Sequence, residues 1–253
     1  MTKTILNIRI RLSLPIALLA FFCNVALAQT TVQPYLGKEQ LPDLIKCLPA
    51  PPDSMSEHFA HDVMRYMWGK EQRKDKARAD MALRDAVWSY EALVNEFVPF
   101  FGIAVNAGET PEIWKLLVKS LTTTDLMRRE PKAFYHRRRP FEVFNEHLLW
   151  EEEEEVLRGE GSYPSGHTMR GWTVAMLLAE INPDAADGLF ARGWEYGESR
   201  VIDGAHWQSD VDISRLAASI GVTALHTSPE FLDQMDRART EYRKIMLLRA
   251  AGE

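Results

Sequence analysis

Residues 161–183 read GSYPSGHTMRGWTVAMLLAEINP, and this stretch decides how the chain folds. From Thr168 to Ile181 the residues are apolar on nearly every face of a helix, and Asn182-Pro183 stops the helix there. A helix that is apolar all round must be buried. We therefore expect this segment at the centre of a helical domain, with Ser165 as a possible N-cap.

Helical patterns fill most of the remaining chain, and strand patterns are nearly absent. Ser54 with Glu57 matches a capping box, so we expect one helix from Ser54 to about Arg78 and another from Asp80. Thr110-Pro111-Glu112 is typical of a helix start. Further helices are expected over 184–202, 209–226 and 229–250. The sequence predicts an all-α, single-domain helical bundle without internal repeats.

The chain is expected to have three parts: a signal peptide over 1–28, an extended proline-rich arm over 29–53, and the helical domain over 54–253. A basic start is followed by an apolar run over 12–25, and Ala26-Leu27-Ala28 matches an export cleavage site. The run is shorter than the ~20 residues that a membrane span needs. We expect export to the periplasm, with no membrane anchor after cleavage.

The charge balance limits the partners. The formal net charge is −6, and removal of three basic and no acidic residues with the signal makes it −9. A net-acidic surface disfavours nucleic acid as a partner, so cations that bind an anion must be gathered in a pocket. Cys47 is the one cysteine outside the signal. It can form no intrachain disulfide, and we expect its thiol to be buried.

The first of three chemical blocks is Lys132-x6-Arg139-Pro140. Lys132 follows Pro131, a favourable first helical position. Arg139, seven residues on, returns to nearly the same helix face, and Pro140 then ends the helix. Two cations on one face, one of them able to make paired bonds to an oxyanion, form half of a phosphate cradle. Alone, this spacing is more typical of a solvated basic face.

The second block is Pro164-Ser165-Gly166-His167. Gly166 permits close approach of the backbone, and the free N–H groups at the helix start attract an anion. His167 would then stand beside that anion. Alone, the tetrapeptide is equally compatible with an ordinary helix start.

The third block is Ser199-Arg200-x5-His206-x3-Asp210. Gly204 breaks a helix after Arg200, so His206 and Asp210 are expected at positions i and i+4 of the next helix. The carboxylate can then accept one imidazole N–H and leave the other nitrogen as a nucleophile. Together, the blocks supply three cations, two histidines and a carboxylate. This set indicates phosphoryl transfer.

The three blocks resemble, at every defining position, the signature of the type 2 phosphatidic acid phosphatase superfamily. Within it the chain resembles the bacterial class A non-specific acid phosphatases, over roughly 42–227. The similar stretches outside the blocks are Leu48-Pro49-Ala50-Pro51-Pro52, Thr110-Pro111-Glu112, Gly161-Ser162-Tyr163, 178–183, 206–212 and 224–227.

The resemblance implies a helical fold shared with the vanadium haloperoxidases, and a role for each site residue. His206 would attack phosphorus to give a phosphohistidine, with Asp210 orienting its ring. His167 would protonate the leaving alcohol and later activate water. Lys132, Arg139, Ser165, Gly166 and Arg200 would bind the phosphoryl oxygens. No metal or other cofactor is implied, small phosphomonoesters such as nucleotides and sugar phosphates are the expected substrates, and similar proteins are often homo-oligomers.

Three other functions share parts of this pattern. A vanadate-dependent haloperoxidase has a similar pocket, but this chain is much shorter than those enzymes. An exported phosphate-binding protein would use the cations without needing His206 or Asp210. A membrane lipid phosphatase carries the signature but needs spanning helices, and the sequence offers none.

Several residues near the blocks are assigned no chemistry. The acidic run 151–155 is expected to be a solvated face or mobile loop, with a loop that repels acidic competitors near the pocket as the alternative. Arg137 and Arg138 are expected to be solvent-facing. Trp207 and Tyr163 are core candidates that could also line the pocket. Relatives often tie the loop between the first two blocks to the region before the catalytic histidine by a cysteine pair. Here Asp203 stands at one of those positions.

Overall fold

The computed structural model describes residues 32–252. All secondary-structure elements within that range are helices, and none is a strand. The predicted all-α class is therefore confirmed for this part of the chain. The signal peptide expected over 1–28 and the first residues of the arm lie outside the described residues. No helix within 32–252 is long and apolar enough to cross a membrane.

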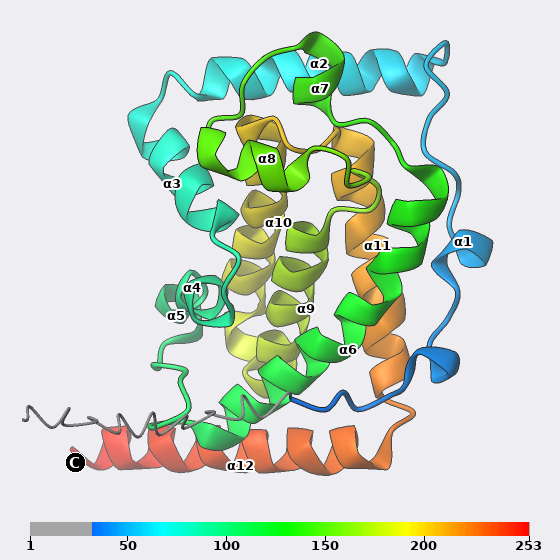
Figure 1. Cartoon of the computed structure of the whole chain (residues 1–253). Helices are drawn as coiled ribbons and strands as arrows, with labels where there is room; N and C mark the ends of the chain where they lie inside the picture. Colours follow the sequence, from blue (N-terminus) through cyan, green and yellow to red (C-terminus); the bar gives the residue numbers. More distant parts are fainter. Residues whose placement is uncertain (1–31, 253) are drawn as a thin grey trace, which may run out of the picture. The chain divides into compact units, whose positions relative to one another are not determined.

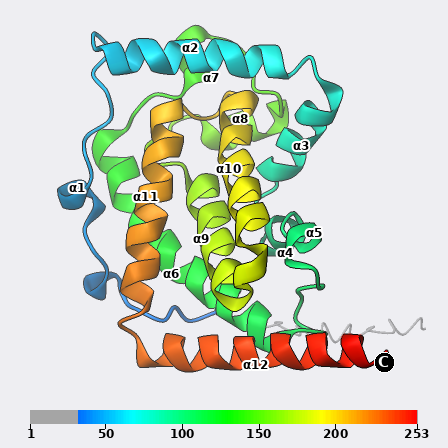
Figure 2. The same ribbon diagram turned by 180° about the vertical axis from the view of Figure 1, so that it is seen from behind.

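Three helices form the centre of the bundle: α9 (Gly166–Ile181), α10 (Ala186–Asp203) and α11 (Gln208–Leu225). They lie side by side between α2 (Glu57–Gln72), which crosses one end, and α12 (Pro229–Ala251), which crosses the other (Figures 1 and 2). As predicted, α9 is buried along almost its whole length, with Ser165 as its N-cap.

The approach of α9 and α10 depends on a small residue. The Cβ of an alanine at Gly171 would lie 2.6 Å from Cδ1 of Tyr196 on α10. Tyr196 is itself almost completely buried. Close packing at this point brings α10 against α9. Arg200 lies on α10, and His167 lies in the first turn of α9.

The start of α2 differs from the expected one. The helix begins at Glu57 because the Ser56 hydroxyl, not that of Ser54, accepts a hydrogen bond from the Phe59 backbone N–H at 3.2 Å. Both serines offer the same chemistry in the sequence. The choice between them is made by the path of the arm that leads into the helix.

The break after α2 also falls earlier than expected. Helix α3 spans Lys76–Ala86, and the Asp75 carboxylate caps it by accepting from the Ala77 N–H at 2.9 Å. Arg78 and Asp80, expected at the end of one helix and the start of the next, both lie inside α3. Asp75 satisfies N–H groups of the first turn, and the helix therefore restarts there.

The expectation that a helix begins at Pro131 is wrong. Helix α6 (Pro111–Tyr135) runs without a break through Pro131, and Lys132 lies in its last turn. The helix ends at His136, whose φ is 40°. Arg139 has an extended backbone (φ −77°, ψ 155°) and caps the short helix α7 (Pro140–Phe144). Lys132 and Arg139 therefore share no helix face.

The link from α10 to α11 confirms one expectation and corrects another. Gly204 ends α10 with a φ of 86°, which favours glycine. His206 was expected inside the next helix, but α11 begins at Gln208, with Trp207 as its N-cap. His206 thus lies in the turn between two helices, where its ring is not restricted to a helix face.

The segment 32–53 contains two short helical elements, η1 (Lys38–Gln40) and α1 (Leu44–Cys47), within otherwise extended chain. Leu44 and Leu48 are buried and fasten it to the domain. Cys47 is exposed, so its expected burial is wrong. Leu44 and Leu48 form the buried face of the short α1 turn, and Cys47 lies on the exposed side.

Candidate active site

A cavity of about 570 Å³ is lined by residues from the first turn of α9 and from the short helix α8 (Glu154–Leu157). Segments from six parts of the sequence surround it. Its lining residues are Ala86, Trp88, Arg128, Lys132, Arg139, Trp150, Glu152, Glu153, Val156, Leu157, Glu160, Gly166, His167 and His206. Both histidines predicted for the site face this one cavity.

Lys132 reaches the cavity from the end of α6. Its Nζ donates to the Gly161 carbonyl at 2.6 Å, and the residue is almost completely buried. Burial, together with the positive charge of Arg139, lowers the pKa of Lys132 to about 7. Its ammonium is therefore poised to bind an anion in acidic solution and to lose its charge in alkaline solution.

Arg139 is held from behind by backbone carbonyls. Its Nε donates to the carbonyls of Leu157 (3.2 Å) and Glu160 (3.1 Å), and its Nη1 to that of Ala205 (3.0 Å). Nη1 also lies 3.2 Å from Nε2 of His206. The guanidinium is thereby fixed in orientation at the cavity wall, with its fork beside the proposed nucleophile.

The arginine contact assigns the tautomer of His206. A guanidinium can only donate, so Nε2 of His206 accepts, and in a neutral ring the proton is on Nδ1. Burial and the charges of Arg139, Lys132 and Arg200 hold the pKa of His206 well below its usual range. The imidazole is neutral, with a free electron pair on the nitrogen that faces the arginine.

Asp210 approaches the other nitrogen of this ring. Its Oδ2 lies 3.5 Å from Nδ1 of His206, longer than a hydrogen bond, and Nδ1 has no other partner among residues 32–252. The same Oδ2 accepts from the Trp207 backbone N–H at 2.9 Å. The expected pairing of His206 with Asp210 is present as a close contact. It is looser than predicted because His206 precedes the helix.

Arg137 corrects a prediction. It was expected to face solvent, but its side chain is 9 % exposed and lies between two fully buried carboxylates. Nη1 donates to Oδ1 of Asp210 at 2.5 Å, and Nη2 donates to Oδ2 of Asp62 at 2.7 Å. No local pattern indicated this role, because nothing in the sequence placed Asp62 near Asp210.

His167 lies in the first turn of α9. Its Nε2 lies 2.9 Å from the Ala86 carbonyl, and its ring meets Trp88 edge-on with centroids 4.6 Å apart. Since a carbonyl can only accept, Nε2 carries a proton and Nδ1 is the nitrogen that gains or releases one. Burial and the charge of Arg200 lower the pKa of His167 well below its usual range.

Ser165 and Gly166 are placed as predicted at the helix start, but only Gly166 lines the cavity. The Ser165 hydroxyl oxygen accepts from the backbone N–H and the hydroxyl of Thr168. A Cβ at Gly166 would lie 3.0 Å from Cδ of Arg128 and 3.3 Å from the ring of Trp88. Glycine therefore keeps the helix start open toward the cavity.

Arg200 is completely buried and does not line the cavity. Its Nη2 donates to Oε2 of Glu153 at 2.8 Å, and its Nη1 lies 3.2 Å from Oδ2 of Asp203. Among the described residues its Nε and Nη1 have no hydrogen-bond partner. Buried donors of this kind are uncommon in proteins and indicate room for a ligand's acceptors.

The acidic run is not uniformly solvated, contrary to expectation. Glu151, Glu152 and Glu155 are exposed, whereas Glu154 is buried and accepts from the Leu148 N–H at 2.8 Å. Glu153 turns inward to Arg200. The run continues into α8, where successive side chains point about 100° apart around the helix axis, so neighbouring carboxylates meet different surroundings.

Asp203 fastens this acidic segment to α10. Its carbonyl accepts from the Leu149 N–H at 3.0 Å, and its Oδ1 accepts from the Trp150 N–H at 3.1 Å. Asp203 is the position at which the resemblance implied a cysteine crosslink that this chain lacks. In this chain, hydrogen bonds to Asp203 hold the loop in place of a disulfide.

The aromatic residues of the cavity are Trp88 and Trp150, neither of which the sequence indicated. Trp207 and Tyr163 are buried instead, in agreement with the expectation that they belong to the core. Trp207 donates through Nε1 to the Arg138 carbonyl at 2.8 Å, and the Tyr163 hydroxyl donates to the Pro49 carbonyl.

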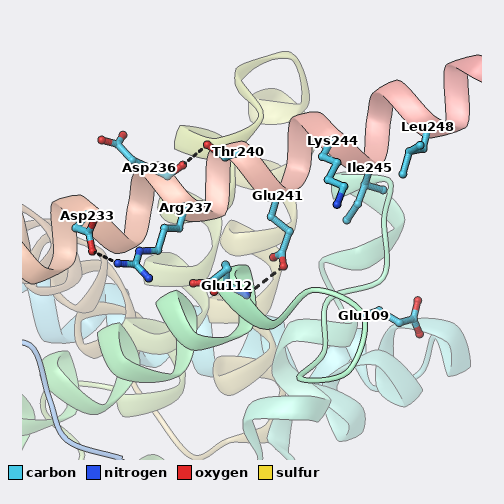
Figure 3. A pocket seen from close by; sticks show the side chains of 10 residues that line it. All are labelled: Glu109, Glu112, Asp233, Asp236, Arg237, Thr240, Glu241, Lys244, Ile245 and Leu248. Atoms are coloured by element: carbon cyan, nitrogen blue, oxygen red, sulfur yellow. Dashed lines mark hydrogen bonds and ion pairs between the residues drawn. The ribbon is translucent and has the colours of Figure 1, made fainter.

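A second cavity, of about 760 Å³, lies between α12 and the start of α6 (Figure 3). Two of its charged groups have close partners. Arg237 donates to Asp233 at 2.8 Å, and Glu241 accepts from the Ile113 N–H at 2.9 Å. None of the predicted site residues lines it.

Comparison with known proteins identifies the family of the chain. Residues 113–232 match the PAP2 superfamily. The chain is 38% identical over 244 residues to a non-specific acid phosphatase of Providencia stuartii, covering 90% of this chain and 98% of that protein. It is 38% identical over 228 residues to one of Salmonella typhimurium, with 88% and 91% covered, and 34% identical over 202 residues to an acid phosphatase of Zymomonas mobilis, with 80% and 76% covered. The chain belongs to the bacterial non-specific acid phosphatases of class A type, within the PAP2 superfamily.

Proposed function

We propose that this acid phosphatase is exported to the periplasm and hydrolyses a broad range of phosphomonoesters through a phosphohistidine on His206. The observation that carries the proposal is the shared cavity: two neutral imidazoles face it, and Lys132 and Arg139 flank it. Behind it lies Arg200, with two buried donors that no described residue satisfies.

In the first step Nε2 of His206 attacks phosphorus as the bond from phosphorus to the ester oxygen breaks. The incoming phosphoryl group must replace the Arg139 contact at Nε2, and Arg139 then binds a phosphoryl oxygen instead. As positive charge develops on the ring, the hydrogen bond from Nδ1–H to the Asp210 carboxylate shortens, since catalytic hydrogen bonds often tighten in the complex.

His167 handles the proton. Substrate binding brings negative charge next to a ring whose pKa is held low by burial, so proton uptake at Nδ1 accompanies binding. The imidazolium donates this proton to the leaving alkoxide, and the neutral ring then takes a proton from the water that attacks the phosphohistidine. Water regenerates His206 and releases inorganic phosphate.

The phosphoryl oxygens are bound by Lys132, Arg139 and Arg200, together with the helix start at Ser165 and Gly166. Positioned cations stabilise the charge of the transferring group, the function that a metal has in other phosphoryl-transfer enzymes. An alcohol could replace water in the second step, giving phosphotransferase activity. We also propose a homo-oligomer, by analogy with similar proteins.

The test is rapid trapping in an alkaline denaturant with a 32P-labelled phosphomonoester, followed by locating the label, because phosphohistidine survives alkali and is hydrolysed in acid. We expect acid-labile label on His206 and none in a His206→Ala variant that still binds phosphate. Label on another residue, or phosphate release without any covalent species, contradicts the mechanism. Binding without turnover in the wild-type chain would indicate the phosphate-binding alternative, and rapid halide oxidation with vanadate and peroxide would indicate the haloperoxidase.

A further inference from the structure

The carboxylate of Glu153 occupies the place that a phosphoryl oxygen needs at Arg200. Glu153 lines the cavity and Arg200 does not, yet Arg200 Nη2 and Glu153 Oε2 are only 2.8 Å apart. The Glu153 side chain is 13 % exposed and the Arg200 side chain is completely buried. The glutamate therefore stands between the arginine and the cavity.

A second carboxylate of the same segment contacts the other cations. Oε2 of Glu160 lies 3.3 Å from Arg139 Nη2 and 3.8 Å from Lys132 Nζ. This side chain is 44 % exposed, so its pairing is weakened by water. The Glu153 pair is better shielded, and a charge-assisted hydrogen bond there is correspondingly stronger.

From this arrangement we propose that Glu153 is an affinity- and specificity-determining residue, an internal carboxylate that competes with the substrate's phosphoryl group for Arg200. The proposal rests on the proposed function. An anion binds fully only when its contacts with Arg200 exceed those of Glu153, so dianionic phosphoryl groups are admitted in preference to carboxylates. On binding, the Glu153 side chain leaves Arg200.

The surrounding contacts allow this exchange without unfolding the segment. Asp203 holds the backbone at Leu149 and Trp150, and Glu154 holds it at Leu148. Neither set of bonds involves the Glu153 side chain. When Glu153 withdraws, Nη1 of Arg200 keeps Oδ2 of Asp203 at 3.2 Å as its ion-pair partner. The freed Nη2, and Nε, which has no hydrogen-bond partner among the described residues, can then donate to the ligand.

The test measures binding of inorganic phosphate by isothermal titration calorimetry in the full chain. We expect Glu153→Gln to bind phosphate about tenfold more tightly than wild type, which corresponds to ~1.4 kcal/mol. The Michaelis constant for a phosphomonoester should fall by a similar factor. Glu153→Asp, which keeps the charge but shortens the side chain, should also tighten binding.

The matched control is Glu155→Gln, which removes the same charge from an exposed position outside the cavity. It should bind phosphate like wild type. If Glu155→Gln tightens binding as much as Glu153→Gln, or Glu153→Asp behaves like wild type, general charge repulsion explains the effect and the proposal is wrong. Unchanged or weaker binding by Glu153→Gln also overturns it, since Glu153 would then position Arg200.

Circular dichroism checks that each variant is folded, and Glu153→Ala serves as a second variant if the glutamine form is not. Failure of the proposed function is distinguishable from failure of this inference. In the first case the wild-type chain releases no phosphate from an ester, whether or not it binds inorganic phosphate. In the second it does both, and only the variants depart from expectation.

Discussion

Arg139 Nη1 lies 3.2 Å from His206 Nε2, so the guanidinium that is proposed to bind the phosphoryl group also holds the nucleophile's electron pair in the free enzyme. The contact keeps the ring neutral and oriented. It must break when phosphorus arrives, and the same arginine then bonds the substrate. The consequences of this arrangement can be measured.

The first prediction concerns Asp210. Asp210→Asn removes the negative charge 3.5 Å from His206 Nδ1 while its side-chain oxygen can still accept from the Trp207 N–H. We expect kcat to fall by at least about 100-fold, because the imidazolium that forms during attack loses its stabilising carboxylate. Steady-state kinetics and a thermal unfolding midpoint measure the effect. An unchanged kcat would show that Asp210 has only a structural role.

The second prediction concerns Arg137, which bridges the buried carboxylates of Asp62 and Asp210. Arg137→Ala leaves both without their cation, so we expect a loss of about 3–5 kcal/mol in the free energy of unfolding and a fall in kcat. Arg138→Ala is the matched control, since Arg138 is exposed and donates to the Glu142 carbonyl. Urea unfolding measures the free energy of unfolding of both variants. Equal stabilities would contradict the bridging role.

The third prediction concerns pH. The pKa of Lys132 is about 7, so its ammonium is present below pH 7 and is lost as the pH rises through 7. Anion affinity should therefore fall more steeply above pH 7 than below it, approaching an additional factor of about ten per pH unit. The low pKa of His167 acts in the same direction, because binding draws a proton onto that ring.

Sulfate is the suitable probe for this effect, because it stays dianionic across the range. Titration calorimetry from pH 5 to 9 should show the steeper decline in wild type, and Lys132→Met should lack it. Phosphatase activity should follow the same trend, with an acidic optimum. Activity that rises steadily through pH 8 would rule out both proton assignments.

The fourth prediction tests the packing that brings α9 against α10. A Cβ at Gly171 would lie 2.6 Å from the buried Tyr196 ring, so Gly171→Ala should destabilise the protein by about 1–3 kcal/mol. At Gly108 the nearest atom to an added Cβ is Asn106 Oδ1 at 3.4 Å, an ordinary contact. Gly108→Ala should have a much smaller effect on the urea midpoint. Similar midpoints for the two variants would mean that α9 and α10 can move apart without loss of stability.

The sequence by itself determined the helical class, the buried central helix and the residue types of the site. It did so because hydrophobic periodicity, proline and glycine stops, and the three short blocks are all local patterns. Gly204 and the start of α6 were predictable for the same reason. Helix ends at Ser56 and Asp75 were missed, because neighbouring residues offered equivalent caps and only the path of the chain selects one.

The tertiary structure alone decided which distant groups meet. Arg137 lies between Asp62 and Asp210, Trp88 stands beside His167, and Glu153 reaches Arg200. Each contact joins segments from different helices or loops, and its formation depends on how helices pack, which no local pattern records. Charge along a sequence does not say whether a side chain faces water or a buried partner, and in this protein that distinction separates a solvated acidic run from a carboxylate held at Arg200.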